Sequence, residues 1–215
     1  MAATRPGKLM IVGCGPGSPD YLTEAGRCAI RSARVLVGSP RLLASYATPA
    51  HEQVPVGADI GAVLDAVAVR REQGGIAILV TGDPGLASLA GPVLRRFGRD
   101  SCEVIPGVSS VQLAFARLGL DWSEARIVSA HKGIPELVPA DLAAFGSIAV
   151  LPGHPRSRQW IGDLAEAFGN ERFLVVCEEL SLPGERIRSV SAAEFRSLEL
   201  SSRTVVLLLK EKILW

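Results

Sequence analysis

Short apolar runs separated by stretches of helical periodicity are the feature that most limits how this chain of 215 residues can fold. Residues 76–80 read Ile-Ala-Ile-Leu-Val, a continuous apolar run typical of a strand buried on both faces of a parallel sheet. Because strand–helix alternation needs crossover connections, the pattern predicts an α/β fold with a mostly parallel sheet. We expect strands at residues 8–12, 34–37, 53–56, 76–80 and 102–105, and helices at residues 21–32, 40–46, 60–72, 86–97 and 108–118.

The second half of the chain repeats this alternation and then departs from it. Strands are predicted at residues 126–129, 147–151 and 173–177, with helices at 135–145 and 156–168 between them. The tail reads as two strands, 185–190 and 204–210, around a short helix at 192–195, which predicts an antiparallel edge and a mixed sheet. Residues 119–123 are the predicted boundary, giving an N-terminal α/β domain of residues 1–120 and a C-terminal α/β domain of residues 121–215.

Charge and composition exclude several classes of partner. Lys and Arg number 23 against 22 for Asp and Glu, so no overall charge attracts the chain to nucleic acid or to a membrane. The four cysteines are scattered without metal-ligand spacing, which predicts free thiols and no metal site. Residues 1–8 lack the apolar core of a signal peptide, and no apolar run approaches the roughly 18 residues that span a bilayer. We therefore expect a cytoplasmic protein.

Three loops rich in Gly and Pro follow predicted strands, where ligands bind in open α/β sheets. They are Gly-Cys-Gly-Pro-Gly-Ser-Pro-Asp at 13–20, Thr-Gly-Asp-Pro-Gly at 81–85 and Pro-Gly-Val-Ser-Ser at 106–110. Glycine removes the Cβ atom that would block a close approach, and proline preorganises the turn. The three loops together predict a ligand site at the carboxyl ends of the strands.

The first loop does not fit a dinucleotide-binding fingerprint. That pattern needs Gly-x-Gly-x-x-Gly, but Ser18 stands at the third glycine position, and Pro16 lacks an N–H group for a pyrophosphate. The acidic residue expected at the end of the second strand is also missing, because that strand ends Val-Leu-Val-Gly at residues 35–38. These departures argue against a nicotinamide or flavin enzyme.

In order and spacing, the three loops resemble the motifs of the tetrapyrrole methylases, S-adenosylmethionine-dependent enzymes of the corrin and sirohaem pathways. The family's V-G-x-G-P-G opening with its later L-T is matched at residues 12–17 and 22–23, its G-D-P loop at 82–84 and its P-G-x-[ST]-[SA] segment at 106–110. The resemblance covers essentially the whole chain. Val-Gly-Ser-Pro-Arg-Leu-Leu at 37–43 and Ser-Ala-His-Lys-Gly at 129–133 are similar to the CbiE-type precorrin methylases within the family.

This resemblance implies an activity and an architecture. CbiE-type enzymes methylate carbon 5 of precorrin-7 or its cobalt form, which is a step of cobalamin biosynthesis. The family fold has two α/β domains with the cofactor in the cleft between them, usually as a homodimer. CbiE-type chains occur alone or fused to a decarboxylating carbon-15 methyltransferase, so association with such an enzyme is an expected partnership.

The resemblance also implies particular site residues. Asp83 is expected to contact the amino-acid part of the cofactor or to fix its loop, with helix capping as the alternative. His131 is expected to bind substrate or to accept the proton lost after methylation, with an ordinary loop histidine as the alternative. The substrate carries several carboxylates, so Arg41 and Lys132 are candidates to bind it, beside Gly15 in the first loop. The implied cofactor contacts are Pro16, Thr81, Gly82, Asp83, Leu86, Ser109 and Ser110, joined by Pro152 and Leu180 of the second half.

Other functions stay open at this point. A sirohaem-type uroporphyrinogen methylase would be expected to carry Gly-Gly-Asp, whereas Thr81 precedes Gly82 here. A methylase acting on RNA or on a diphthamide precursor belongs to the same superfamily, but an RNA substrate predicts a concentrated run of Lys and Arg that this chain lacks. A non-enzymatic tetrapyrrole carrier has no need of a cofactor loop.

Overall fold

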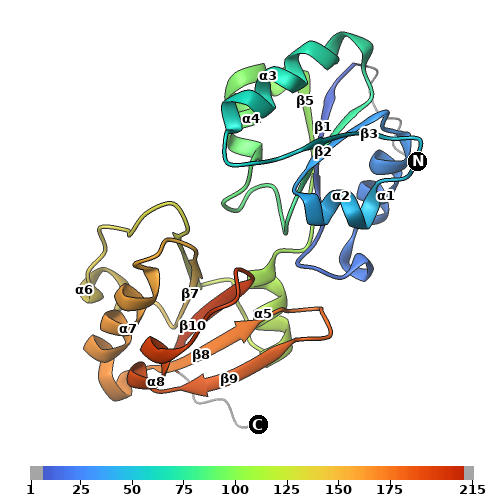
Figure 1. Ribbon diagram of the computed structural model, residues 1–215. Helices are drawn as coiled ribbons and strands as arrows, with labels where there is room; N and C mark the ends of the chain where they lie inside the picture. Colours follow the sequence, from blue (N-terminus) through green and yellow to red (C-terminus); the bar gives the residue numbers. More distant parts are fainter. Residues whose placement is uncertain (1–6, 211–215) are drawn as a thin grey trace. The chain divides into compact units, whose positions relative to one another are not determined.

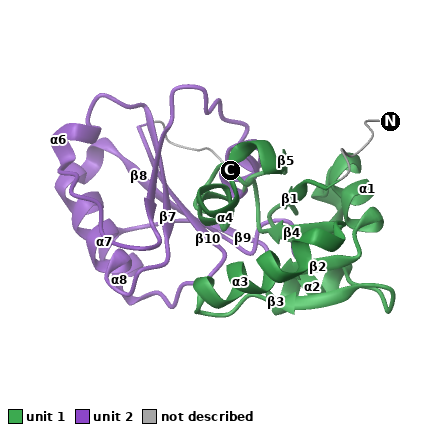
Figure 2. Ribbon diagram, turned by 90° about the horizontal axis from the view of Figure 1, so that it is seen from above, with its two compact units in different colours: residues 1–109 green, residues 110–215 purple. Residues whose placement is uncertain are grey.

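The computed structural model describes residues 7–210 and forms two compact units, Met1–Ser109 and Ser110–Trp215 (Figure 2). Most of the N-terminal stretch considered above therefore lies outside the described residues. None of the helices within residues 7–210 has the length and apolar character needed to cross a membrane.

The first unit contains a five-stranded, fully parallel sheet in the order β3-β2-β4-β1-β5. Figure 1 shows this unit with its helices α1 to α4. This confirms the parallel sheet that the apolar runs predict. The strands are β1 (Leu9–Gly13), β2 (Val35–Gly38), β3 (Glu52–Pro55), β4 (Ile76–Val80) and β5 (Cys102–Ile105). The helices are α1 (Glu24–Ser32), α2 (Pro40–Tyr46), α3 (Ile60–Arg70) and α4 (Ala90–Phe97), with 3-10 turns at η1 (Pro19–Tyr21), η2 (Arg71–Gln73) and η3 (Arg99–Ser101).

Side chains of alternate strand residues build a core on each face of this sheet. In β4, Ile76 and Ile78 belong to the core that contains α3 and α4, whereas Ala77 and Leu79 belong to the core that contains α1 and α2. All five residues of β4 are buried, which explains its continuous apolar sequence. The result is a three-layer α/β/α unit whose strand ends are free to carry loops.

The second unit contains a mixed sheet in the order β6-β7-β10-β8-β9. Strands β6 and β7 are parallel, and β10 is antiparallel to both of its neighbours. The strands are β6 (Arg126–Ala130), β7 (Ser147–Pro152), β8 (Phe173–Glu178), β9 (Arg186–Val190) and β10 (Thr204–Leu209). The helices are α5 (Ser110–Leu118), α6 (Pro139–Leu142), α7 (Ser157–Phe168) and α8 (Ala192–Ser197), with a 3-10 turn at η4 (Gly169–Glu171).

Of the two strands predicted at the tail of the chain, only the first lies at an edge of this sheet. Strand β9 is the expected antiparallel edge, but β10 lies in the centre, paired with β7 on one side and β8 on the other. All six residues of β10 are buried, in keeping with their sequence Thr-Val-Val-Leu-Leu-Leu. A strand with so many apolar side chains is more stable in the centre of a sheet, where both of its edges are paired, than at an exposed edge.

Two further boundaries differ from the sequence prediction. The units divide between Ser109 and Ser110 instead of near residue 120, because α5 contacts β10 of the second sheet. Helix α6 covers only four residues of the helix predicted at 135–145. The apolar side chains Leu137, Leu142 and Phe145 still pack on the core of the second unit, and the predicted helical period came from that packing.

Candidate functional site

Three loops meet at the carboxyl edge of the first sheet. Strands β4, β1 and β5 are neighbours and run parallel, so the loops that follow them (residues 81–89, 13–20 and 106–109) leave the sheet side by side. The backbone of Gly15 pairs with that of Gly82 in both directions, with N···O distances of 3.3 and 2.7 Å. The Cys14 N–H group donates to the Val80 oxygen at 2.8 Å. The first two loops thus continue the pairing of β1 with β4 beyond the sheet.

Gly13 and Gly107 let the first and third loops approach each other at backbone distance. A Cβ atom on Gly13 would lie 2.6 Å from the Gly107 nitrogen, and one on Gly107 would lie 2.5 Å from the Gly82 oxygen. Both distances are far below van der Waals contact, so neither position accepts a side chain. The absent Cβ atoms therefore serve the packing of loop against loop, in addition to any approach of a ligand.

Asp83 fastens the second loop to the third. One carboxylate oxygen accepts a hydrogen bond from the Gly85 N–H group at 2.7 Å, and the other accepts one from the Gly107 N–H group at 3.1 Å. Helix α4 begins only at Ala90, after Ala87 with a φ of 48°, so the carboxylate does not cap a helix that starts near Gly85. The geometry fits the expectation that Asp83 fixes its loop.

Arg41 and Thr81 lie together beside these loops. Nη2 of Arg41, in the first turn of α2, donates to the Thr81 hydroxyl at 2.9 Å. Burial raises the pKa of the Cys14 thiol to about 12, while the positive charge of Arg41 acts in the opposite direction. Burial likewise raises the pKa of Tyr46, and Arg41 again opposes the shift. Arg41 therefore places a positive charge beside the first and second loops.

The remaining candidates of this edge differ in exposure. Pro16 is buried within the first loop, and Thr81 is exposed. Leu86 is half-buried and donates its N–H group to the Asp83 carbonyl oxygen at 3.2 Å. Ser109 is 7% exposed and ends the first unit, and Ser110 begins α5.

In the second unit, His131 and Pro152 lie side by side at the ends of two parallel strands. His131 follows β6 and Pro152 ends β7, and the register pairs Ala130 with Pro152. The imidazole Nδ1 lies 3.5 Å from the Pro152 carbonyl oxygen. Lys132 follows as an exposed side chain. The structure thus places both strand-end candidates of this unit at one edge of the second sheet.

Leu180 lies in a tight loop after β8. It is 3% exposed, and both of its neighbours are left-handed, Glu179 with a φ of 53° and Ser181 with a φ of 71°. Non-glycine residues in this region carry strain that surrounding contacts must offset. Arg203 forms an ion pair with Glu179 at 2.5 Å, and the Ser181 N–H group donates to Glu185 at 2.6 Å. These contacts hold the loop in its shape.

Glu178 is a buried carboxylate outside the set of residues predicted for the site. It ends β8 with 0% exposure and accepts a hydrogen bond from Arg188 at 2.8 Å, with Arg186 at 3.3 Å. The two arginines stand two positions apart on β9 and so point to the same face of the strand. Two arginines at this spacing, opposite a carboxylate on a neighbouring strand, are the sequence signal that could have predicted the ion pair.

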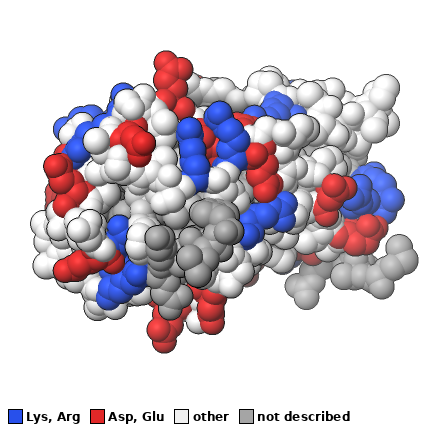
Figure 3. All heavy atoms as spheres, turned by 90° about the horizontal axis from the view of Figure 1, so that it is seen from below, with Lys and Arg blue, Asp and Glu red and all other residues white. Residues whose placement is uncertain are grey.

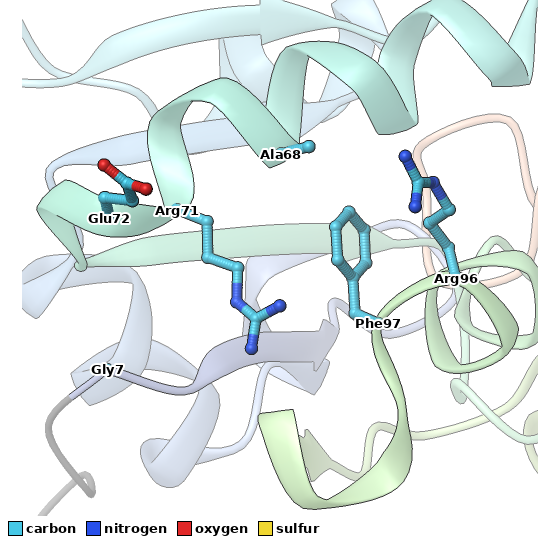
Figure 4. Close-up of a pocket in the computed structure, with 6 residues that line it drawn as sticks. All are labelled: Gly7, Ala68, Arg71, Glu72, Arg96 and Phe97. Atoms are coloured by element: carbon cyan, nitrogen blue, oxygen red, sulfur yellow. The ribbon is translucent and has the colours of Figure 1, made fainter.

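A separate hollow of about 450 Å³ lies at the opposite edge of the first sheet, where β1 begins (Figure 4). The guanidinium groups of Arg71 and Arg96 both lie 5.8 Å from the centre of the Phe97 ring, and Arg71 donates to Ser101 at 2.7 Å. Helices α3 and α4 end here, and positive side chains stabilise the negative ends of helices. These contacts account for the arginines structurally, and the hollow lies away from the strand-end loops.

Charges of both signs are mixed on the face of the protein shown in Figure 3. On the face shown in Figure 3, Lys and Arg side chains alternate with Asp and Glu, and no extended area of one sign forms. Within residues 7–210, no group of three or more His, Cys, Asp or Glu side chains is arranged to hold a metal ion.

Together, the two open sheets and the fastened loops define an α/β protein, a class in which ligands generally bind beyond the carboxyl ends of parallel strands. The family model "Tetrapyrrole (Corrin/Porphyrin) Methylases" matches residues 8–196. The chain belongs to this family, and its relatives are methyltransferases.

Two curated relatives and one solved structure extend this result. The cobalt-precorrin-7 C(5)-methyltransferase of Salmonella typhimurium is 32% identical over 180 residues, which is 83% of this chain and 88% of that enzyme. The decarboxylating precorrin-6Y C(5,15)-methyltransferase of Mycobacterium tuberculosis is 30% identical over 197 residues, 86% of this chain but only 46% of that enzyme. The precorrin-6Y methylase CbiE of Archaeoglobus fulgidus superimposes with a TM-score of 0.73 at 28% identity, covering 96% of this chain and 100% of that one.

Proposed function

We propose that this chain transfers a methyl group from S-adenosylmethionine to carbon 5 of precorrin-7 or cobalt-precorrin-7 in cobalamin biosynthesis. The observation that carries the proposal is the similarity to the Salmonella enzyme, which extends through both units of the fold. The three family loops, fastened together at one sheet edge, support it from the structure.

S-adenosylmethionine is the methyl donor of this family and supplies a methyl group on a positively charged sulfur. The first sheet has features that fit such a ligand at its carboxyl edge. Thr81 is exposed and its hydroxyl accepts a hydrogen bond from Arg41. The backbone of Gly82 is paired with Gly15 of the first loop, and the Asp83 carboxylate accepts a hydrogen bond from Gly107 of the third loop. Such preorganisation lowers the ordering cost of binding. We assign cofactor contacts to Pro16, Thr81, Gly82, Asp83, Leu86, Ser109, Ser110, Pro152 and Leu180.

The substrate side of the proposal rests on cations and one histidine. Arg41 and Lys132 are assigned to the carboxylates of the tetrapyrrole, because guanidinium and ammonium groups form charge-assisted hydrogen bonds with them. Gly15 is assigned to the floor of the substrate site. We assign to His131 the role of accepting the proton that the ring carbon loses once the new carbon–carbon bond has formed. No nucleophilic side chain is required, because the methyl group arrives already activated.

A binding experiment and a product analysis test this function. Calorimetry with S-adenosylhomocysteine is expected to show binding at micromolar concentrations, and no binding would contradict a methyltransferase. Incubation with a ¹³C-methyl donor and precorrin-7, with and without cobalt, is expected to give one labelled methyl group at carbon 5. Labelling of uroporphyrinogen III instead would favour a sirohaem-type activity, and labelling of RNA would favour a macromolecular substrate.

The Asp83→Ala variant tests how the second loop is held. Without the carboxylate, the Gly85 and Gly107 N–H groups lose their acceptor, and the second and third loops separate. We expect the dissociation constant for S-adenosylhomocysteine to rise about tenfold or more, equivalent to at least one hydrogen bond to a charged group. The Asp100→Ala variant removes an exposed aspartate and serves as the control. Equal affinities in the two variants would remove Asp83 from the site.

Three features of assembly and location are also part of the proposal, and the dimer and the partner enzyme among them rest on the family resemblance. The chain forms a homodimer, acts in the cytoplasm and works beside a decarboxylating carbon-15 methyltransferase. Light scattering of the purified chain tests whether it is a dimer. Co-purification with the carbon-15 enzyme tests whether the two enzymes associate.

A further inference from the structure

The ring of His131 occupies the space that a side chain at position 153 would need. A Cβ atom built on Gly153 would lie 2.1 Å from Nδ1 of His131, and the next two nearest atoms, at 2.8 and 2.9 Å, belong to the same ring. No protein atom can stand that close to a carbon that is not bonded to it. A side chain at position 153 and the imidazole of His131 in its present place are therefore incompatible.

The sheet explains why these two residues meet. Ala130 of β6 is paired with Pro152 of β7, so the residues that follow each strand leave the same edge in neighbouring positions. The His154 N–H group donates to the Ala130 oxygen at 2.9 Å, which holds the two strand ends together. The imidazole then lies beside residue 153 with Nδ1 as its nearest atom, and Nδ1 is 3.5 Å from the Pro152 oxygen.

We propose that Gly153 is a positioning residue for His131, making the room that lets the imidazole lie against the end of β7 with Nδ1 facing the Pro152 carbonyl. A carbonyl oxygen only accepts hydrogen bonds, so this orientation favours the tautomer with its proton on Nδ1. Nε2 is then the acceptor of the ring, as a group that takes a proton or a hydrogen bond from the substrate must be. The link to catalysis rests on the proposed function, whereas the placement of the ring does not.

The Gly153→Ala variant changes the ring position with little other disturbance. The φ angle of Gly153 is not in the left-handed region, so the backbone accepts alanine, and the atoms nearest to the new Cβ belong to a side chain that can rotate away. Gly133→Ala is the matched control, because position 133 lies two residues after His131, is also not left-handed and has open space around its Cβ. Both variants are expected to fold.

The placement is tested by ¹⁵N NMR of the histidine ring nitrogens, which distinguishes the two tautomers. In the wild-type chain and in Gly133→Ala, the His131 signals are expected to show the proton on Nδ1. In Gly153→Ala they are expected to shift toward a mixture of tautomers. Unchanged His131 signals in Gly153→Ala would overturn the proposal, whether or not the chain methylates precorrin-7.

The catalytic consequence is tested by a double-mutant cycle with His131→Gln. We expect Gly153→Ala to lower kcat roughly 10²-fold, as a displacement of about 1 Å can, with the affinity for S-adenosylhomocysteine unchanged. In the His131→Gln background the same substitution is expected to have no further effect, because residues that act through one another are not additive. Equal losses in the two backgrounds would overturn the coupling. A His131→Gln variant with full activity would remove His131 from the proposed function while leaving the NMR result to decide the placement.

Discussion

Arg172 shows at the scale of one residue how backbone carbonyl groups can hold a buried charge. Its side chain is 6% exposed, and its guanidinium lies within hydrogen-bond distance of the carbonyl oxygens of Leu142, Ala143, Phe145, Gly146 and Leu208. Burial lowers the pKa of this guanidinium, and Glu171 acts in the opposite direction. Four of the five acceptors belong to the last residue of α6 and to the segment between α6 and β7, where a four-residue helix leaves its last carbonyl groups without helical partners.

The Arg172→Met variant is expected to destabilise the second unit strongly. Methionine fills much of the space but leaves several buried carbonyl groups without a donor, at about 1–3 kcal/mol each, so we expect a loss of at least about 3 kcal/mol. All three tryptophans lie in the second unit, so tryptophan fluorescence in urea follows its unfolding. The control is Arg126→Met, which removes an exposed arginine 5.8 Å from the Phe145 ring and is expected to cost less than about 0.5 kcal/mol. Similar losses in both variants would mean that the carbonyl contacts of Arg172 contribute little.

The roles of single residues were harder to predict than their positions. The Gly-Asp-Pro sequence indicated a tight turn after a buried strand, and the structure has that turn. That Asp83 also holds Gly107, 24 residues later, depends on β4 and β5 both lying beside β1, which no local pattern specifies. The contact of His131 with Gly153 has the same origin, because it needs the register of β6 with β7.

At the scale of elements, the strand-end loops behave as one layer because their glycines interlock. A Cβ atom on Gly107 would meet the Gly82 oxygen at 2.5 Å and the Gly13 carbonyl carbon at 2.6 Å, and both are backbone atoms that cannot rotate away. Any side chain here must push the first and second loops away from the third. The strain therefore spreads over three elements instead of one turn.

The Gly107→Ala variant tests this interlocking. We expect it to destabilise the first unit by about 1–3 kcal/mol, as overpacking does, and to weaken binding of S-adenosylhomocysteine at least tenfold because the loops move. Circular dichroism on heating and calorimetry provide the two measurements. Gly57→Ala is the matched control, because its Cβ points into open space and its φ is not left-handed, so its stability should change by less than about 1 kcal/mol. A Gly107→Ala variant as stable and as tight-binding as Gly57→Ala would contradict the close approach.

Helices and strands with a strong hydrophobic period were predictable from the sequence, whereas the strands that pair with one another were not. The fully apolar β4 and the amphipathic α1 and α7 appear where the pattern placed them, because their own burial dictates their sequence. Strand β10 was expected near an edge but lies in the centre, because strand order is decided by long-range pairing. The first residues of the helix predicted from 86 are a loop instead, since Ala87 is left-handed and breaks the helical path.

At the scale of the whole molecule, the two-unit organisation was predictable and its boundary was not. The alternation of strands and helices restarts near residue 126, which located a second α/β unit. Helix α5 follows β5 as the earlier helices follow their strands, so the local sequence pattern assigned it to the first unit. Helix α5 instead contacts β10 of the second sheet, and several of its residues, among them Val111 and Phe115, are buried.

Each unit also buries a thiol that links stability to alkaline pH. Burial raises the pKa of Cys14 in the first unit and of Cys177 in the second from 9.0 to about 12. Between pH 9 and pH 12 the folded thiol keeps its proton while the unfolded one has lost it, so the folded state binds more protons and the free energy of unfolding falls as the pH rises. Below pH 9 both states are protonated, and the contribution of the thiols is fully present.

Tryptophan fluorescence makes this linkage specific to one unit, because it reports the second unit alone. We expect the free energy of unfolding measured in this way to fall between pH 9 and pH 12, with Cys177 contributing up to about 1.4 kcal/mol per pH unit. Cys177→Ala removes the titrating group and should give a shallower decline, although the variant starts from a lower stability because a buried atom is lost. Cys28→Ala, at a half-exposed position in the first unit, should leave the slope as in the wild-type chain. Equal slopes in both variants would mean that the Cys177 thiol ionises in the folded unit near its ordinary pKa, and that burial does not exclude the thiolate.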